Sequence, residues 1–183
     1  MKPLAVHDVR VYIFYGHFVL RDVWCDAGDE GESLKAAQGD SVAGASTYQL
    51  TVRALSHVAG LQIRLWPADP EPDGGAWDGC RQLELHCPTG QLTVEQIAAG
   101  AATEIQLPTG AGVYGVRVQW RDREAADKAI TAAYAELCGE PSDVLTSALC
   151  KLDGMEKFLV DLWWQAPLPP DDDDEDFYGD EWS

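Results

Sequence analysis

Short segments in which apolar residues alternate with other residues constrain the fold of this chain more than any other feature. Between residues 48 and 120 such segments recur at short intervals, separated by turns such as Pro88-Thr89-Gly90 and Pro108-Thr109-Gly110. Successive side chains of a β-strand point to opposite faces, so an alternating segment presents one face to a core. Several short strands joined by Gly/Pro turns are typical of a sandwich or barrel. The sequence therefore predicts a mainly β fold, an antiparallel β-sandwich of about eight strands.

The expected strands occupy the segments 9–20, 48–54, 61–65, 82–87, 92–94, 105–107, 114–120 and 158–164. The first of these is apolar or aromatic at most positions, which favours one central strand covered on both faces. The stretch 26–45 is rich in Gly, Asp, Glu, Ser and Ala, a composition that indicates a long exposed loop.

The hydrophobic pattern changes to helical spacing at Asp122 and returns to alternation at Phe158. Gly139 can end one helix, and Pro141 can open a second. A helical insertion of about residues 122–151 is too short to bury a core of its own. We therefore expect it to precede the last strand of a single domain that spans residues 1–170.

Trp163 and Trp164 are neighbours on the last predicted strand, so their side chains point to opposite faces. One of the two faces belongs to the core. We expect the helical insertion to pack over the other face. The alternative is that one tryptophan is exposed and serves as an anchor in an interface.

The chain is strongly acidic, with 31 Asp and Glu residues against 13 Lys and Arg residues and a net charge of −18. Eight of the acids lie in residues 171–183, and the remaining residues are still acidic. Such a charge repels nucleic acid and anionic membranes and attracts a basic partner. The alternative is that the charge only maintains solubility.

No apolar segment is long enough for a transmembrane helix or a secretory signal, which indicates a cytoplasmic protein. The cysteines are odd in number, scattered and without a Cys-x-x-Cys pair, and they are Cys25, Cys80, Cys87, Cys138 and Cys150. We expect reduced, mostly buried thiols and no structural zinc. No phosphate-binding motif is present, since Gly74-Gly75 and Gly110-Ala111-Gly112 lack the residues of a P-loop. No cofactor and no metal are predicted.

Catalytic residues are equally hard to identify. No serine lies in a nucleophile-elbow sequence, and no cysteine has neighbours that would lower its pKa. His17 and His86 could converge in the folded chain, with a carboxylate such as Asp22, to form a metal or acid–base site. This hydrolase hypothesis is weaker than the interpretation of both histidines as ordinary strand residues. No catalytic residue is therefore assigned.

The C-terminal segment 171–183 combines acids with aromatic residues and is predicted to be disordered in the free protein. The candidate binding residues are Asp171, Asp172, Asp173, Asp174, Glu175, Asp176, Phe177, Tyr178 and Trp182. The acids would steer a basic partner, and the aromatic side chains would anchor it. The alternative is a segment that only keeps the protein in solution.

Four segments resemble, in the same order, a family of uncharacterised bacterial β-sandwich proteins related to the competence protein J group. They are Tyr15-Gly16-His17-Phe18-Val19-Leu20-Arg21-Asp22, Leu83-Glu84-Leu85-His86-Cys87-Pro88-Thr89-Gly90-Gln91-Leu92-Thr93-Val94, Gly112-Val113-Tyr114-Gly115-Val116-Arg117-Val118 and Glu156-Lys157-Phe158-Leu159-Val160-Asp161-Leu162-Trp163. The resemblance implies a β-sandwich. Because the competence member inhibits a DNA-entry nuclease, it also implies binding to a protein. No inhibitory residue of that group carries over to this sequence.

These observations favour a non-catalytic protein-binding module of the immunity or inhibitor type. Its expected partner is a basic protein, such as an enzyme that acts on nucleic acid, and neither nucleic acid nor a membrane is bound directly. The alternative is an accessory or structural component of a larger assembly, docked through the sandwich or the helical insertion.

Overall fold

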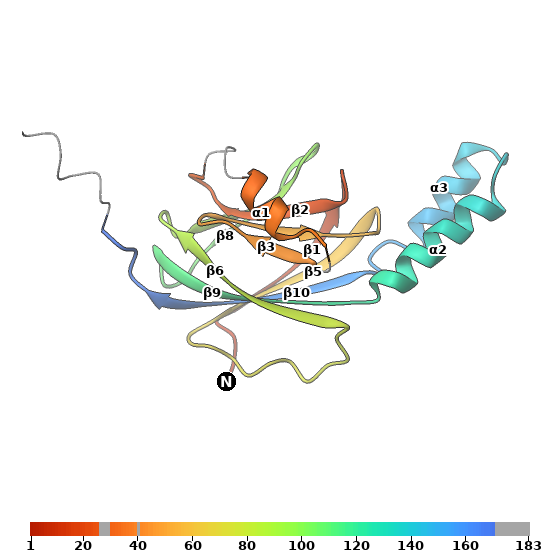
Figure 1. Cartoon of the computed structure of the whole chain (residues 1–183). Helices are drawn as coiled ribbons and strands as arrows, with labels where there is room; N and C mark the ends of the chain where they lie inside the picture. The colour runs from red at the N-terminus through yellow and green to blue at the C-terminus, as the bar shows by residue number, and fades with distance from the viewer. Residues whose placement is uncertain (26–29, 40, 171–183) are drawn as a thin grey trace, which may run out of the picture.

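The computed structural model describes residues 1–25, 30–39 and 41–170, and its strands form two five-stranded sheets (Figure 1). The first sheet has the order β1 (Ala5–Tyr12), β5 (Val58–Trp66), β10 (Lys157–Ala166), β9 (Gly112–Arg121) and β6 (Gly79–Cys87). The second has the order β3 (Ala43–Ala45), β4 (Gln49–Arg53), β2 (His17–Asp22), β7 (Gln91–Gln96) and β8 (Gly100–Gln106). The helices are α1 (Glu30–Ala36), α2 (Arg123–Glu136) and α3 (Ser142–Cys150). The predicted mainly β fold is confirmed.

Both sheets contribute to one hydrophobic core. The rings of Phe18 in β2 and Phe158 in β10 meet edge to face, with centroids 5.4 Å apart. Both side chains are buried, together with aliphatic residues of the neighbouring strands such as Ile63 and Val94. The alternation in the sequence therefore marks the inward faces of the strands correctly.

Strand number and direction differ from the expectation. The described residues form ten strands instead of about eight, and β5 pairs with β10 in parallel whereas the other neighbours are antiparallel. The parallel pair arises because β10 enters the sheet between β5 and β9, after the helices. Alternation cannot distinguish the two directions, since the side-chain period is the same in both.

The single central strand expected over residues 9–20 is wrong. The chain turns at Tyr15 and Gly16, which have φ values of 56° and 75°. β1 therefore lies at the edge of the first sheet, and β2 lies at the centre of the second. Gly16 is the residue that permits such a turn at low cost, but its flanking apolar residues obscured this signal in the sequence.

The long exposed loop expected over residues 26–45 is also wrong, because this part of the chain contains α1 and β3. The helix packs closely on the second sheet. Ser33 Oγ and Thr51 Oγ1 are 2.7 Å apart, and Gln49 Nε2 donates to Ser33 Oγ across 2.9 Å. Gly44 faces the helix backbone, where an added Cβ would lie 2.4 Å from the backbone N of Ala37. The contact between the helix and the sheet thus consists of small and polar residues, and a segment of this composition resembles a loop in the sequence.

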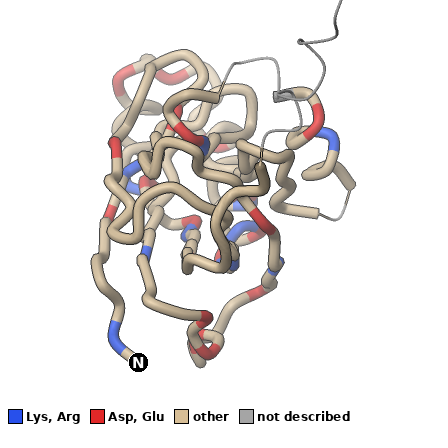
Figure 2. The backbone as a smooth tube through the Cα atoms, turned by 90° about the vertical axis from the view of Figure 1, so that its left-hand side faces the viewer, with Lys and Arg blue, Asp and Glu red and all other residues tan. Residues whose placement is uncertain are grey.

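The outer face of the first sheet, which points away from the core, is covered in part by the loop 67–78 (Figure 2). Arg117 Nη1 donates to the backbone O of Pro70 across 2.7 Å, and Arg117 Nη2 lies 2.8 Å from Asp69 Oδ1. Arg64 Nη1 donates to Asp73 Oδ2 across 2.8 Å. Acids of the loop therefore pair with arginines of the sheet and fasten the loop to it.

Trp163 lies on this outer face and is only 6% exposed. The guanidinium of Arg117 stacks over its ring at 5.3 Å from the centroid, while Trp164 packs against the core on the other side. The expected cover of helices over this face is wrong. The loop 67–78 and its ion pairs lie there instead.

A buried carboxylate fixes the position of Arg64, which lies beneath the loop 67–78. Asp161 is fully buried and accepts hydrogen bonds from Arg64 Nε at 2.7 Å and from Trp66 Nε1 at 2.7 Å. The hydrogen bonds that Arg64 donates to Asp161 raise the pKa of Arg64, so the guanidinium remains charged. Paired in this way, a charge tolerates burial.

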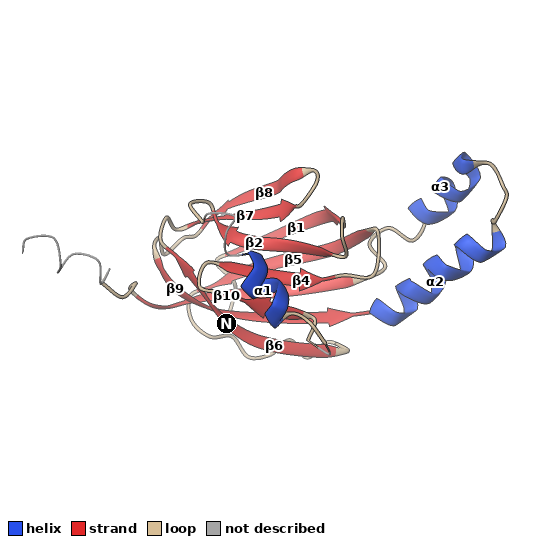
Figure 3. Ribbon diagram, turned by 45° about the horizontal axis from the view of Figure 1, so that its top comes forward, coloured by secondary structure: helices blue, strands red, loops and turns tan. Residues whose placement is uncertain are grey.

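The predicted helical insertion before the last strand is confirmed, since α2 and α3 lie between β9 and β10. They form a hairpin that extends away from both sheets (Figure 3). Only Ala126 and Ile130 of α2 are buried, and no residue of α3 is buried. Most of the surface of the hairpin therefore faces outward.

Candidate binding surface

Exposed aromatic and apolar side chains gather at the end of the molecule from which the hairpin extends. We call this set the hairpin-end surface. It consists of Tyr12 (52% exposed), Phe14 (41%), Tyr15 (84%), Leu55 (43%) and Tyr134 (45%). Large exposed apolar side chains placed together are characteristic of interaction surfaces, and tyrosine is enriched among residues that dominate binding energy.

The β1–β2 turn and the β4–β5 loop build most of this surface, and α2 supplies Tyr134. Ile13 N donates to His57 O across 2.8 Å, and Ala54 N donates to Gly16 O across 2.9 Å. These backbone hydrogen bonds run in both directions between the turn and the loop. They hold the exposed rings of the turn beside Leu55.

A buried carboxylate joins the β4–β5 loop to the base of the hairpin. Glu156 is fully buried and accepts hydrogen bonds from Leu55 N at 2.9 Å, Ser56 N at 2.9 Å and Ser56 Oγ at 2.7 Å. Arg123 Nε, at the start of α2, donates to the other carboxylate oxygen across 3.0 Å. One side chain therefore fixes the loop, the first residue of α2 and the entry into β10.

A second contact ties the hairpin to the loop. The hydroxyl of Tyr134 lies 3.2 Å from Nε2 of His57, and their rings meet edge to face with centroids 6.1 Å apart. Both side chains remain exposed. The contact leaves the phenol ring accessible while limiting its orientation, which reduces the entropy lost when a partner binds.

The hairpin extends the surface with further apolar and acidic side chains. Val144 of α3 is 41% exposed. Residues 122–154 contain seven acids against three bases, and two of those bases, Arg123 and Lys128, pair with acids of the chain itself. An apolar surface bordered by uncompensated acids suits a partner that is basic around an apolar centre.

The structure does not bring His17 and His86 together. His17 is paired with Arg53 at one end of β4, whereas His86 N donates to Thr47 O before β4 begins. About six residues of extended chain, or roughly 20 Å, separate these positions. The hydrolase site considered for the two histidines is therefore not formed.

The hydrogen bonds of Asp22 indicate a structural role. It is fully buried and accepts hydrogen bonds from Thr89 N at 3.0 Å, Thr89 Oγ1 at 2.7 Å and Trp24 N at 3.0 Å. These bonds hold the β6–β7 turn against the end of β2. In the described ranges, no three His, Cys, Asp or Glu side chains lie in an arrangement that could hold a metal ion.

The expectation of mostly buried cysteines is wrong. Only Cys87 is buried and Cys25 is half-buried, while Cys80, Cys138 and Cys150 are exposed. Two of the exposed thiols lie on the hairpin, whose outward position the sequence did not reveal. Cys80, Cys87, Cys138 and Cys150 are free thiols.

The predicted binding residues Asp171–Asp176, Phe177, Tyr178 and Trp182 lie outside the described residues. The hairpin-end surface was not found from the sequence, since its members come from the β1–β2 turn, the β4–β5 loop and α2 and look like ordinary strand or helix residues there. A possible signal was the Phe14-Tyr15 pair immediately before Gly16. Among the described helices, none is long and apolar enough to cross a membrane.

Comparison with solved structures identifies two chains of similar fold. One is ComJ from Bacillus subtilis, described as an inhibitor of the DNA-degrading activity of NucA. It matches with a TM-score of 0.52 and 13% identity, over 90% of this chain and 98% of ComJ. The other is the product of crocagin biosynthetic gene J, with a TM-score of 0.52 and 13% identity, over 88% of this chain and 99% of that one.

No protein-family model matches the chain, and no curated protein matches it in sequence. At 13% identity the two structural matches show a shared fold. The resemblance to the competence protein J group, predicted from four sequence segments, is thereby confirmed at the level of the fold.

Proposed function

We propose that this protein is a non-catalytic protein-binding module of the inhibitor type, which acts by covering a basic partner. The observation that carries the proposal is the hairpin-end surface, where five large exposed side chains lie beside a projecting acidic hairpin. Contact with such a surface would bury the aromatic rings at the centre of an interface and leave acids at its rim.

The structural match supports the inhibitor role. ComJ, which shares the fold, is an inhibitor of a DNA-degrading enzyme. A protein that binds DNA carries basic surface for the phosphates, and a chain with a net charge of −18 is attracted to such a surface. A nucleic-acid-acting enzyme is therefore the partner class that we propose, in the cytoplasm.

In the same proposal, residues 1–170 act as one domain that carries the hairpin-end surface, and residues 171–183 add to it. The acids Asp171–Asp176 would accelerate encounter by long-range attraction. Phe177, Tyr178 and Trp182 would then contribute apolar contacts. Two separate attachment points on one chain would increase affinity through effective concentration.

The outward position of the α2–α3 hairpin also favours a second function, that of an accessory component in a larger assembly. No residue of α3 is buried, so both helices offer side chains to a neighbour. The two functions differ in the salt dependence of binding. A steered, charge-rich inhibitor complex weakens as salt screens the charges, whereas an apolar assembly contact does not.

The experiment that tests the proposal is affinity capture from the native cytosol, followed by an activity assay of the captured protein. The bait is the full chain, and the variant is the double substitution Tyr15→Ala and Tyr134→Ala. We expect the full chain to retain a basic protein at low salt and to inhibit its activity on DNA or RNA when added back. The variant should lose at least tenfold in affinity, since each ring is a candidate hot spot worth about 1–2 kcal/mol.

Trp24→Ala is the matched control. Trp24 is 78% exposed but follows the end of β2 that is remote from the hairpin, so its removal should leave binding unchanged. Equal loss in the control and the double variant would contradict a role for the hairpin-end surface. Capture that resists high salt and leaves the partner fully active would favour the assembly function instead.

A further inference from the structure

Strand register places three cations in one row across the outer face of the first sheet. Arg10 of β1 is paired with Gly60 of β5, Gly60 with Lys157 of β10, and Lys157 with Arg121 of β9. Paired residues of neighbouring strands point to the same face. Strands lie about 4.8 Å apart, so the row spans roughly 14 Å. No acid interrupts it, although the chain as a whole is strongly acidic.

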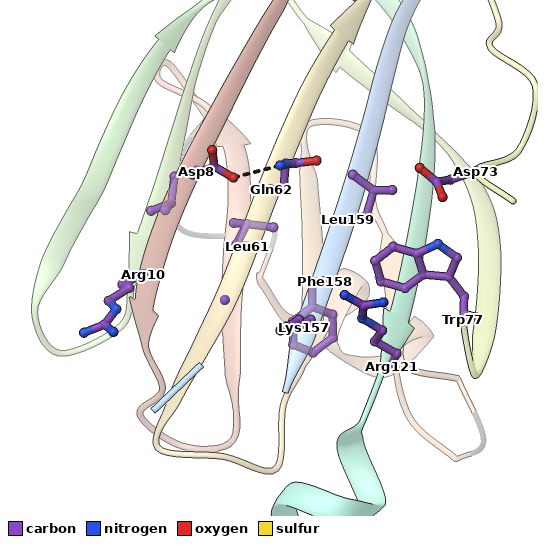
Figure 4. Close-up of a pocket in the computed structure, with 12 residues that line it drawn as sticks. Asp8, Arg10, Leu61, Gln62, Asp73, Trp77, Arg121, Lys157, Phe158 and Leu159 are labelled. Carbon is purple, nitrogen blue, oxygen red and sulfur yellow. Dashed lines mark hydrogen bonds between the residues drawn. The ribbon is translucent and has the colours of Figure 1, made fainter. Parts of the chain in front are cut away.

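The row crosses an open cleft of about 390 Å³ (Figure 4). Asp8 and Arg10 form one wall, and Trp77 and Asp73 of the loop 67–78 form the other. Gly60, Gln62 and Leu159 line the space between the walls. Because Asp8 and Arg10 follow strand β1, the cleft suits an extended chain segment that runs along this strand. Its volume lies in the range of ordinary ligand sites.

The acids of the cleft are already engaged. Asp8 Oδ1 accepts a hydrogen bond from Gln62 Nε2 at 2.8 Å. Asp73 accepts from Gly75 N at 2.9 Å and from Arg64 Nη1 at 2.8 Å, and the Gly75 and Arg64 hydrogen bonds lower its pKa. The cleft therefore contains two carboxylates that are occupied by other donors.

The cations of the row are less engaged. No ion pair joins Arg10 or Lys157 to another part of the chain that the structure describes. Arg121 stacks over Trp77 at 5.0 Å from the ring centroid, and its nearest carboxylate oxygen, on Asp122, is 3.7 Å away. The row thus presents positive charge beside the aromatic ring of Trp77.

We infer that this cleft binds the chain's own C-terminal segment 171–183 in the free protein. That segment supplies the complementary chemistry, with eight acids and three aromatic residues. Within it, Asp180 and Glu181 immediately precede Trp182. Carboxylates at these positions can pair with the row while the indole packs against Trp77.

The length of the chain permits this contact. The cleft lies near Lys157 at the start of β10, and the segment follows the end of β10 at Ala166. These ends are nine residue steps apart, or about 30 Å. The 14 residues from Ala166 to Asp180 reach up to about 46 Å when extended. The segment is therefore long enough for the chain to reverse direction after β10 and return to the cleft.

Because the segment 171–183 is attached to the chain, it is favoured over a separate polyanion as the occupant of the cleft. A protein with a net charge of −18 repels an external acidic ligand at long range. A segment on the same chain is held at an effective concentration on the order of millimolar, which offsets that repulsion. A basic partner would then compete with the row for the same acids, and the segment would transfer from the cleft to the partner.

The test is zero-length carbodiimide coupling in the full chain, which joins a lysine amine to a carboxylate in contact with it. The chain has five lysines, namely Lys2, Lys35, Lys128, Lys151 and Lys157. Mass spectrometry of the monomeric product should place most of the cross-links to the segment 171–183 on Lys157. At about 0.5 M salt, where the Debye length falls to about 4 Å, the Lys157 yield should drop about fivefold or more.

Arg10→Glu should reduce the Lys157 cross-link to the same extent, because it places an acid in the row. Lys128→Glu, with the same charge change on the exposed face of α2, should leave the Lys157 cross-link unchanged. Cross-links spread evenly over the lysines would overturn the inference. So would Lys157 cross-links found only between two chains, which would assign the cleft to a second copy. The experiment contains no partner, so its result is independent of the proposed function.

Discussion

Arg123, the first residue of α2, donates a hydrogen bond from Nε to the buried carboxylate of Glu156 across 3.0 Å. Glu156 is fully enclosed, and the backbone of the β4–β5 loop occupies its other acceptor positions. The base of the hairpin and the hairpin-end surface therefore depend on one buried side chain.

Replacing Glu156 with Ala should lower the free energy of unfolding by about 3 kcal/mol, since it leaves a cation and buried donors without their acceptor. Glu156→Gln keeps one acceptor oxygen and should cost less, about 1–2 kcal/mol. Urea unfolding of the full chain measures both. Glu124→Gln, which removes an exposed i,i+4 pair with Lys128, should have little effect. An Ala variant as stable as this control would show that Glu156 is dispensable.

Gly44 allows α1 to approach the second sheet. An added Cβ would lie 2.4 Å from the backbone N of Ala37, and a backbone atom cannot move aside cheaply. Gly44→Ala should therefore destabilise the protein by about 1–3 kcal/mol. Gly31→Ala in the same helix meets no atom within 4 Å and should be neutral or stabilising by up to about 1 kcal/mol. Thermal unfolding of the two variants compares them, and equal stabilities would refute the close approach.

The contribution of Asp73, in the loop 67–78, to the stability of the fold depends on pH. Hydrogen bonds from Gly75 N and from Arg64 hold the pKa of its carboxyl below the ordinary value of 3.8. Because the folded pKa is the lower one, the ionised carboxylate stabilises the fold above pH 3.8, and this contribution is lost as the pH falls through the folded pKa. An NMR titration of the Asp73 carboxyl carbon should give a midpoint below 3.8. The midpoint should rise in Arg64→Gln, and an unperturbed midpoint in the unsubstituted protein would contradict the contacts.

The cysteines should react with a thiol reagent in a defined order. Cys138 and Cys150 are exposed on the hairpin and should react first. Burial raises the pKa of Cys80, so its thiolate fraction is smaller and its labelling slower. Burial raises the pKa of Cys87 further, and it should react only when the protein unfolds. Mass spectrometry of the labelled peptides over time gives the order, and early labelling of Cys87 would show that the core opens locally.

Several features of the fold follow from the sequence. The alternation predicts a mainly β protein, the change of period predicts the helices between β9 and β10, and four ordered segments predict the fold of the competence protein J group. Each of these signals is local. A helix needs its own spacing of apolar residues, and a strand needs only its own alternation.

Other predictions fail where a local pattern has two interpretations. Tyr15 and Gly16 turn the chain within a run of apolar residues, so one expected strand becomes two strands in different sheets. The small and polar residues of α1 and β3 resemble a loop. Their structure depends on a contact with the second sheet, and tertiary contact outweighs weak local preference.

The sequence by itself determined which residues alternate, where the helical hairpin begins and how much negative charge the chain carries. Only the tertiary structure decided which residues became neighbours across strands. It set Arg10, Gly60, Lys157 and Arg121 in one row, and it laid the loop 67–78 rather than the hairpin over Trp163. The physical reason is that alternation specifies the face of a strand but not its partner, and the partner is selected by the joint packing of segments far apart in the chain.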